Sequence, residues 1–290
     1  MKCRLAGSLA TLLLTAALLS AGLPFSAEAD AATLERVRDS GAIKIGYRED
    51  AKPFSYADAS GLPTGYTVEI CNAVVSAVRQ RLQRDDIKAQ YVLVTAENRF
   101  AKLKSGEIDL LCGASSITLE RRAEVDFSLL TFVTGSSVLY RKDGPANFLD
   151  LVGQKVGVRA GTTTEEGLQG ALAEAGIEAQ VVAVESHEAG LRDLENGTLA
   201  AYFADRAILA MLGRSAQQPE NLRLSDRFFS YEPYALALPR GDSDFRLLVD
   251  TTLARLYRSQ GIVKIYHAHF GDAPVSDLLR ATFTLQALPE

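Results

Sequence analysis

The sequence predicts an α/β protein built from two similar lobes. Between residues 43 and 111 the order strand, helix, strand, helix, strand is typical of a parallel sheet with helices on both faces. The same order restarts at residue 155 and runs to residue 203. The residues after 234 hold one strand-like run and one helix-like run. They are too few for a third domain, so we expect them to return and complete the first lobe.

The first lobe is expected to contain three strands and two helices. Alternating apolar residues predict a strand at 43–47, and further strands are expected at 91–94 and 108–111. A second helix should carry Phe100 and end at Gly106. The first helix is amphipathic, and the apolar residues that share one of its faces are Ile70, Val74, Val75, Val78 and Leu82.

The second lobe is expected to repeat this plan. Ser186 should cap its second helix, and Asp205 should cap the helix after its last strand. The return segment should supply a strand at 234–238 and a helix at 245–257. The other expected elements are strand 155–158, helix 163–175, strand 181–184, helix 187–195 and strand 200–203.

These elements divide the chain into two lobes joined by a hinge. Residues 30–134 and 235–290 are assigned to lobe 1, and residues 135–234 to lobe 2. The chain then crosses between the lobes near residues 134–137 and 229–234. Two extended crossings form a hinge, and the cleft between the lobes is the expected ligand site.

Residues 1–29 have the pattern of a secretory signal peptide. Lys2 and Arg4 give a basic start, residues 5–23 are largely apolar, and residues 27–29 (AEA) fit a cleavage site. We expect cleavage after Ala29 and export to a bacterial periplasm; the alternative is a membrane anchor. No later run approaches the ~20 apolar residues of a membrane-spanning helix.

Charge and cysteine content narrow the function classes. The formal net charge of −5 argues against nucleic acid as a partner. Cys3 leaves with the signal peptide, so Cys71 and Cys112 remain, in a compartment where they either form a disulfide or stay as two buried thiols. We find no nucleotide-binding glycine pattern, P-loop or zinc spacing, and expect no cofactor. Residues 267–269 (HAH) fit a surface or packing role better than a metal site.

Two segments in different lobes look suited to hold an anion. Gly161-Thr162-Thr163 combines a tight turn, hydroxyls and the start of a helix, where unpaired N–H groups face outward. Residues 115–121 (SSITLER) add hydroxyls and Arg121 from the other lobe. Facing one another, the two segments would clamp a carboxylate or phosphate.

Several short segments together resemble the periplasmic amino-acid-binding proteins of ABC importers (solute-binding protein family 3), and within them the glutamate/aspartate-binding proteins. The resemblance spans essentially the whole mature chain. It implies the type II two-lobed fold, in which each lobe is a mixed or parallel sheet flanked by helices and a two-strand hinge joins the lobes. The segments are 43–49 (IKIGYRE), 53–56 (PFSY), 98–99 (NR), 112–113 (CG), 120–121 (ER), 161–163 (GTT), 186–187 (SH) and 194–195 (LE).

The resemblance implies which residues hold the common part of an amino acid. Arg121 would fork onto the α-carboxylate, with Ser116 beside it. Thr163 would meet the same carboxylate through its backbone N–H, and Asp205 would take the α-ammonium. Two alternatives stay open: Arg121 as a surface helix charge and Asp205 as a helix cap.

The resemblance also implies that four residues select the ligand side chain: Arg48, Arg99, Arg159 and His187. A cation at Arg48 suits a side-chain carboxylate, and an anion nearby would favour the charged form of His187. Arg159 reaches either the ligand or solvent. Close glutamate/aspartate binders carry serines where this chain has Ala96 and Ala114, which leaves open a broader binder of acidic and amide amino acids.

These implications describe a receptor rather than an enzyme. We expect a monomer that binds glutamate or aspartate and docks transiently on a membrane-embedded ABC permease. Two alternatives remain: a cyclohexadienyl dehydratase-like lyase on the same fold, which would need a general acid such as Asp205, and a periplasmic sensor module. Phe54, with Tyr47 or Tyr56, either lines the cleft or packs in the core.

Overall fold

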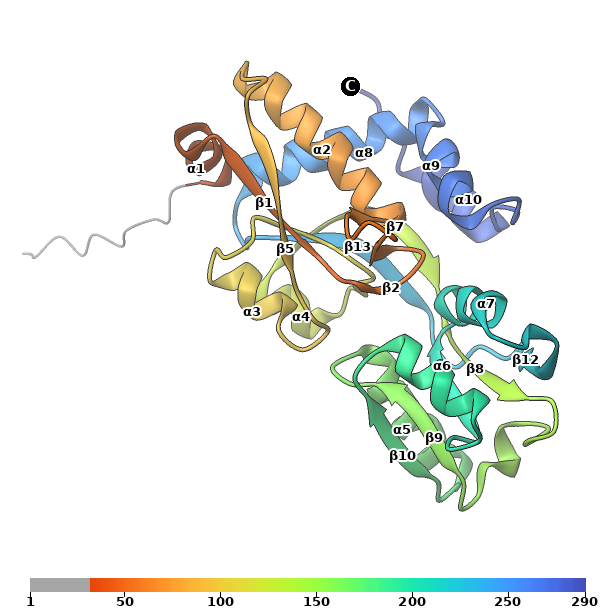
Figure 1. The fold of residues 1–290 in the computed structure, drawn as a ribbon. Coiled ribbons are helices and arrows are strands. Elements are labelled where there is room, and N and C mark those ends of the chain that lie inside the picture. The colour runs from red at the N-terminus through yellow and green to blue at the C-terminus, as the bar shows by residue number, and fades with distance from the viewer. Residues whose placement is uncertain (1–31) are drawn as a thin grey trace, which may run out of the picture. The chain divides into compact units, whose positions relative to one another are not determined.

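The computed structural model describes residues 32–290, and the expected signal peptide lies outside them. In this range the structure has two five-stranded sheets and one small three-stranded sheet (Figure 1). We call the sheet that contains β1, with the helices on it and the small sheet, lobe 1, and the sheet that contains β9, with its helices, lobe 2. The small sheet follows β1 and consists of β2 (Asp50–Ala51), β3 (Ser55–Ala57) and β4 (Pro63–Thr64).

The sheet of lobe 1 is mixed, in the order β5-β1-β6-β13-β7. β1 pairs in parallel with β5 and β6, whereas β13 runs antiparallel to both β6 and β7. The returning strand β13 therefore lies inside the sheet, as expected for a segment that completes lobe 1. The strands are β1 (Ala42–Tyr47), β5 (Lys88–Leu93), β6 (Leu110–Cys112), β7 (Asp126–Thr134) and β13 (Glu232–Leu238).

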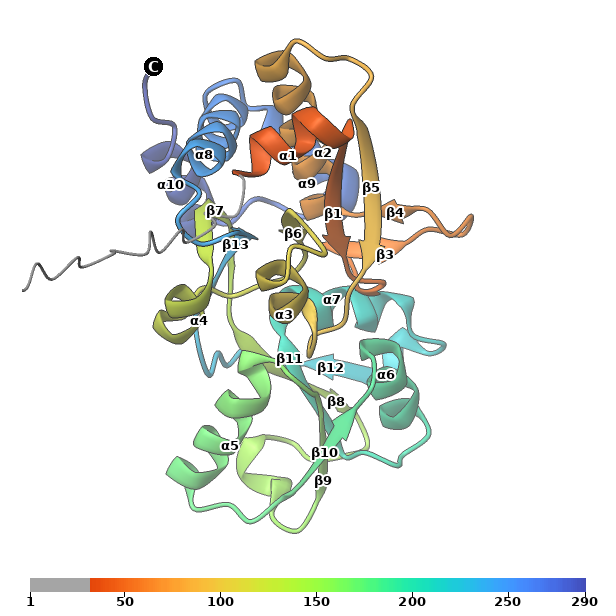
Figure 2. The same ribbon diagram turned by 90° about the vertical axis from the view of Figure 1, so that its left-hand side faces the viewer.

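Helices cover both faces of this sheet (Figures 1 and 2). α2, α8 and α9 pack on one face, and α3 and α4 pack on the other. The amphipathic pattern of α2 explains its side, because its apolar stripe is buried against the sheet. The helices are α1 (Thr33–Ser40), α2 (Tyr66–Leu82), α3 (Arg99–Lys104), α4 (Leu119–Glu124), α8 (Ser243–Arg258), α9 (Gly261–Phe270) and α10 (Asp277–Leu285).

The sheet of lobe 2 has the order β10-β9-β11-β8-β12. Its first three strands are parallel, and β8 runs antiparallel to its neighbours. The strands are β8 (Ser136–Arg141), β9 (Lys155–Arg159), β10 (Gln180–Val184), β11 (Ala201–Asp205) and β12 (Leu222–Leu224). The helices are α5 (Thr163–Ala175), α6 (His187–Glu195), α7 (Arg206–Ser215) and the 3₁₀ turns η1 (Phe148–Leu151) and η2 (Pro219–Asn221).

The strongest sequence signals gave the right element bounds. Helices α5 and α6 match their expected ranges, because Thr162 and Ser186 cap them through their side chains. The long strands β7 and β8 and the helices α1, α9 and α10 were not expected. The strands of the βαβ units are parallel as expected, and the antiparallel strands β7, β8 and β13 make each sheet mixed, which the fold prediction included.

The chain passes between the two sheets twice. It passes from β7 to β8 at Gly135 and returns between the end of β12 and the start of β13. The two crossings touch, since a Cβ on Gly135 would lie 2.2 Å from the carbonyl oxygen of Ser230. The backbone N–H of Ser136 also donates to Ser230 Oγ at 3.2 Å. Only glycine fits this close approach of two backbones.

An aromatic cluster forms part of the lobe 1 core. Phe54 is fully buried, and its ring makes edge contacts with Tyr66, Phe132, Tyr234 and Phe270 at 4.9–6.2 Å between ring centroids. Edge-to-face pairs add stability beyond the area they bury. Phe54 is thus a core residue, which decides between the two roles that the sequence left open.

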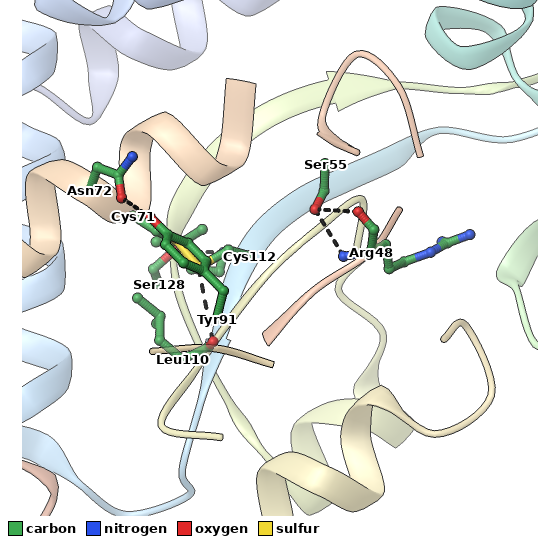
Figure 3. Close-up of a disulfide and its surroundings, with 9 residues drawn as sticks. Arg48, Ser55, Cys71, Asn72, Tyr91, Leu110, Cys112 and Ser128 are labelled. Carbon is green, nitrogen blue, oxygen red and sulfur yellow. Dashed lines mark hydrogen bonds between the residues drawn. A yellow bond between two sulfur atoms is a disulfide. The ribbon is translucent and has the colours of Figure 1, made fainter. Parts of the chain in front are cut away.

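A disulfide links helix α2 to strand β6. Cys71 and Cys112 are both fully buried, and their sulfur atoms are bonded although the two residues are 41 positions apart in sequence (Figure 3). Of the two states that the sequence left open for these cysteines, the structure has the disulfide. The bond ties the end of β6, which leads directly into Ser115 and Ser116, to the helix that covers the sheet.

Removing this bond should destabilise the protein. We expect Cys71→Ala/Cys112→Ala to lower the free energy of unfolding by about 2–4 kcal/mol, because the cross-link restricts a long loop of the unfolded chain. Urea titration followed by circular dichroism measures the change. Reduction of the wild type should give a similar loss, and equal stability of the two proteins would contradict a closed disulfide in solution.

Candidate functional site

The sequence-predicted residues gather where strands of both sheets end. Arg48 directly follows β1, and Ser116 follows β6. From lobe 2, Arg159 and Asp205 are the last residues of β9 and β11. The first residues of α5 and α6 are Thr163 and His187. The carboxyl ends of strands are where open α/β sheets bind ligands.

Arg48 is buried and already paired within the protein. Its backbone N–H donates to Ser55 Oγ at 2.9 Å, and Ser55 Oγ donates to the Arg48 carbonyl at 3.0 Å (Figure 3). Its Nε donates to Asp50 Oδ1 at 2.8 Å, and its Nη2 lies 2.7 Å from the same oxygen without hydrogen-bond alignment. Asp50 therefore compensates the charge of Arg48 within the protein, and the contact of Arg48 with a ligand carboxylate stays a prediction.

Arg159 connects the two lobes. Its Nε donates to Asp50 Oδ2 at 2.9 Å, and its Nη1 donates to Glu97 Oε1. Asp50 and Glu97 belong to lobe 1, whereas Arg159 ends a strand of lobe 2. The side chain of Arg159 is 5% exposed, so it does not point into solvent, and both of its charged contacts are with carboxylates of the protein.

Arg99 and Arg121 share an aromatic platform. Their guanidinium carbons lie 4.7 Å and 5.0 Å from the ring centroid of Phe100. Arg99 Nη1 donates to the carbonyl of Gly161 in lobe 2 at 3.2 Å, and Arg121 Nη1 donates to the carbonyl of Ser116 at 2.9 Å. Within residues 32–290 neither guanidinium forms an ion pair with a carboxylate within 4.0 Å.

Burial makes Arg99 a strong candidate to receive an anion. Its residue is 2% exposed and its Nε has no hydrogen-bond partner among the described residues. Burial lowers the pKa of Arg99 well below its usual value, and the nearby cations Arg48 and Arg121 lower it further. A buried cation surrounded by other cations gains more than an exposed one when an anion binds beside it.

Ser116 and Thr163 meet across the lobes. Thr163 Oγ1 donates to Glu232 Oε2 at 2.9 Å and lies 3.3 Å from Ser116 Oγ. Because Thr163 is the first residue of α5, its backbone N–H has no acceptor within the helix. The two anion-binding segments thus do face one another, as the sequence suggested. The hydroxyl of Ser115 next to them is fully buried and without a partner in the described chain.

Asp205 presents one free carboxylate oxygen. Tyr234 donates its hydroxyl to Asp205 Oδ2, while Oδ1 has no partner among the described residues. Burial raises the pKa of Asp205 to about 7, with Glu232 adding to the rise. Its side chain does not cap α7, which corrects the capping role expected from the sequence.

His187 is neutral in this structure. It is 2% exposed, and its Nδ1 lies 2.8 Å from the hydroxyl of Tyr202. Burial, together with the nearby cation of Arg48, lowers the pKa of His187 to about 3. In the protein on its own, burial and a neighbouring cation outweigh the attraction of Asp50, and the charged form expected beside a bound anion stays a prediction.

Four residues of this region were missed by sequence reasoning: Asp50, Glu97, Glu232 and Tyr234. Asp50 lies two positions after Arg48, a spacing that could have suggested a local ion pair. Glu97 precedes Asn98-Arg99 and carried no signal of its own. Glu232 and Tyr234 lie at the start of the returning strand, and only the folded sheet brings them beside Thr163 and Asp205.

The other histidines have local partners. His267 Nδ1 lies 2.8 Å from the carbonyl of Gly271, and His269 Nε2 lies 2.7 Å from Glu69 Oε2. Over the described part of the chain, no group of three or more His, Cys, Asp or Glu side chains is arranged to hold a metal ion. No helix of residues 32–290 is long and apolar enough to cross a membrane.

The raised pKa of Asp205 predicts a pH dependence of stability. The folded protein keeps the Asp205 proton up to about pH 7, whereas an unfolded chain loses it near the usual value of 3.8. The contribution to stability is thus full below 3.8 and is lost as the pH rises through about 7. We expect Asp205→Asn to flatten the fall in melting temperature of the ligand-free protein between pH 5 and 8. An identical pH profile in both proteins would contradict this assignment.

The chain is similar in sequence and in fold to known amino-acid-binding proteins. The Glutamate/aspartate import solute-binding protein of Salmonella typhimurium is 34% identical over 245 residues, which cover 83% of this chain and 81% of that protein. The L-glutamate/L-aspartate-binding protein of Pseudomonas aeruginosa is 32% identical over 269 residues, 92% of this chain and 88% of that protein. The crystal structure of AncCDT-1, an ancestral amino acid-binding protein and a precursor of cyclohexadienyl dehydratase, has 25% sequence identity and a TM-score of 0.71, covering 83% of this chain and 100% of that chain.

A family model matches residues 43–272, most of the described chain. This range contains every predicted site residue and both crossings between the sheets. The two-lobed α/β fold and the resemblance stated from the sequence are confirmed by these matches. The chain belongs to the bacterial extracellular solute-binding proteins, family 3.

Proposed function

We propose that this protein is a periplasmic receptor that binds glutamate or aspartate between its lobes and delivers it to an ABC permease. The observation that carries the proposal is a complementary set of charges. Arg99 and Arg121 have no carboxylate partner within residues 32–290, and Asp205 has a free buried oxygen. Glutamate and aspartate carry two carboxylates and one ammonium, and these charges match two cations and one carboxylate of the protein.

Each group has a natural place on such a ligand. Arg121, the hydroxyl of Ser116 and the backbone N–H of Thr163 would bind the α-carboxylate, since a guanidinium and a helix start both suit a planar anion. Asp205 would bind the α-ammonium. Arg99 would bind the side-chain carboxylate, a role that the resemblance implied for Arg48 with Arg99 as a further donor. Arg48 and Arg159 would frame the pocket through Asp50.

The hinge would allow the two lobes to open and close. Groups for the ligand come from both lobes, so the closed form alone makes all the contacts and a bound ligand favours it. We infer that residues 134–137 and 229–234 form the hinge. The closed form would then be the one that docks on the permease. The names of the relatives support an importer role, and the expected signal peptide supports the periplasm.

Two alternatives are distinguishable from this proposal. A lyase would use the protonated carboxyl of Asp205, whose pKa is raised to about 7 by burial, as its general acid. An ammonium partner explains the same carboxyl without a reaction, and the relatives named above are binding proteins. A broader receptor for acidic and amide amino acids is the second alternative, because Ala96 and Ala114 offer no hydroxyls to a side-chain carboxylate.

A thermal-shift screen of the twenty amino acids tests the function. Glutamate and aspartate should raise the melting temperature of ligand-stripped protein more than any other amino acid. At one hundred times the dissociation constant, a ligand adds about 2.7 kcal/mol, or roughly 5–10 °C for a chain of this size.

The same screen separates the alternatives. Equal shifts from glutamine and asparagine would favour the broader receptor. No shift from any amino acid would contradict the receptor proposal. Turnover of arogenate or prephenate by the purified protein would favour the lyase instead.

Arg99 should be the residue that selects the side-chain carboxylate. We expect Arg99→Met to weaken glutamate binding about 100-fold and glutamine binding much less, because a desolvated charge-assisted pair is worth several kcal/mol whereas an amide forms a weaker bond. Isothermal titration calorimetry measures both ligands. Arg122→Gln, on the exposed side of α4, is the matched control and should leave both affinities unchanged. Equal losses for glutamate and glutamine would place the side chain elsewhere.

A further inference from the structure

Asp50 occupies the place that a ligand carboxylate would take between two arginines. Its Oδ1 accepts from Arg48 Nε at 2.8 Å, and its Oδ2 accepts from Arg159 Nε at 2.9 Å. The residue is 8% exposed, so water replaces neither contact. This is how a bound dicarboxylate would bridge two guanidiniums, except that the carboxylate belongs to the protein.

We propose that Asp50 is a specificity-determining residue that acts as an internal carboxylate, withholding Arg48 and Arg159 from the ligand and thereby reducing the preference for acidic over amide side chains. The inference rests on the proposed function, since it concerns which amino acid the same site accepts. It also identifies a role for the two arginines other than contact with the ligand.

The charges of this region support the assignment. Arg48 and Arg159 face two carboxylates, Asp50 and Glu97, so this part of the site is balanced without a ligand. Burial alone would raise the pKa of Asp50, but Arg48 and the other neighbouring cations outweigh it and hold the pKa below its usual value. Asp50 is therefore ionised at neutral pH.

Glu97 does not share this role. It contacts Arg159 but not Arg48, and its side chain is 48% exposed. Solvent screens an exposed carboxylate, so its removal changes the potential in the site less than the removal of a buried one. Of the two carboxylates, Asp50 alone touches both arginines and is shielded from water.

The position of Asp50 also links specificity to closure. Strand β2, which carries Asp50, belongs to lobe 1, and Arg159 reaches it from lobe 2. In an ordinary cleft a ligand supplies the charge that bridges the lobes. Here the bridge is already present. Two buried arginines without a carboxylate partner would cost several kcal/mol. Because Asp50 compensates them, the closed site can also hold a neutral amide side chain.

The test compares glutamate with glutamine in calorimetry. We expect Asp50→Asn to raise the ratio of glutamate to glutamine affinity at least about tenfold, because an uncompensated cation within 4–6 Å changes the stability of an anion by one pKa unit or more. The Asn side chain keeps an acceptor for one arginine. Glu97→Gln, which removes the same charge from the same arginine, should change the ratio less. Glu107→Gln, which removes an exposed charge paired with Lys102, should leave it unchanged.

A second variant, Asp50→Asn/Arg159→Gln, keeps the inference testable if Asp50→Asn alone does not fold. It removes one charge of each sign and still frees Arg48, so the ratio should rise in the same direction. Circular dichroism and melting curves check that each variant is folded.

Every outcome decides the inference separately from the function. A wild type that binds neither ligand, with a variant that acquires glutamate binding, would support the role of Asp50 and contradict the proposed function. An unchanged ratio in both variants, or no glutamate binding in any protein, would overturn the inference. An equal effect of Glu97→Gln would assign the effect to general charge rather than to Asp50.

Discussion

Charge compensation away from water is the constraint on which the binding region depends. Four arginines lie near the carboxyl ends of strands in the two sheets: Arg48, Arg99, Arg121 and Arg159. A buried ion without a partner costs several kcal/mol. Asp50 and Glu97 compensate two of them. The other two lie over the ring of Phe100 and donate only to backbone carbonyls. The placement of a ligand follows from where the protein leaves cations without anions.

The same charges explain why the lobes touch. Arg159 contacts carboxylates of lobe 1, Arg99 contacts the backbone of Gly161 in lobe 2, and Thr163 contacts Ser116. Gly161 has φ +69°, and a Cβ there would lie 3.1 Å from Glu97 Cγ, so glycine permits this approach. Binding chemistry and closure therefore use one set of residues rather than two.

Local signals predicted most of the fold and part of the site. Helix α5 begins and ends where Thr162 and Gly176 predicted, because capping depends on neighbours in sequence. Asp50 and Arg159 are 109 positions apart in sequence, and no local sequence pattern predicts a contact between residues so distant. The neutral His187 of the ligand-free protein has a related origin, because burial and the cation of Arg48 act on its ring only in the folded chain.

Tyr234 carries a consequence for how the protein can be divided. Its ring packs against Phe54 in the core of lobe 1, its backbone bridges to Ser116, and its hydroxyl donates to Asp205 of lobe 2. One residue of the returning strand thus joins the core, the segment beside Arg121 and the group assigned to the ammonium. A chain that ends before this strand, through proteolysis or early termination, would lose both its ligand site and part of the lobe 1 core. Residues 32–134 alone would therefore form neither a stable lobe nor a ligand site.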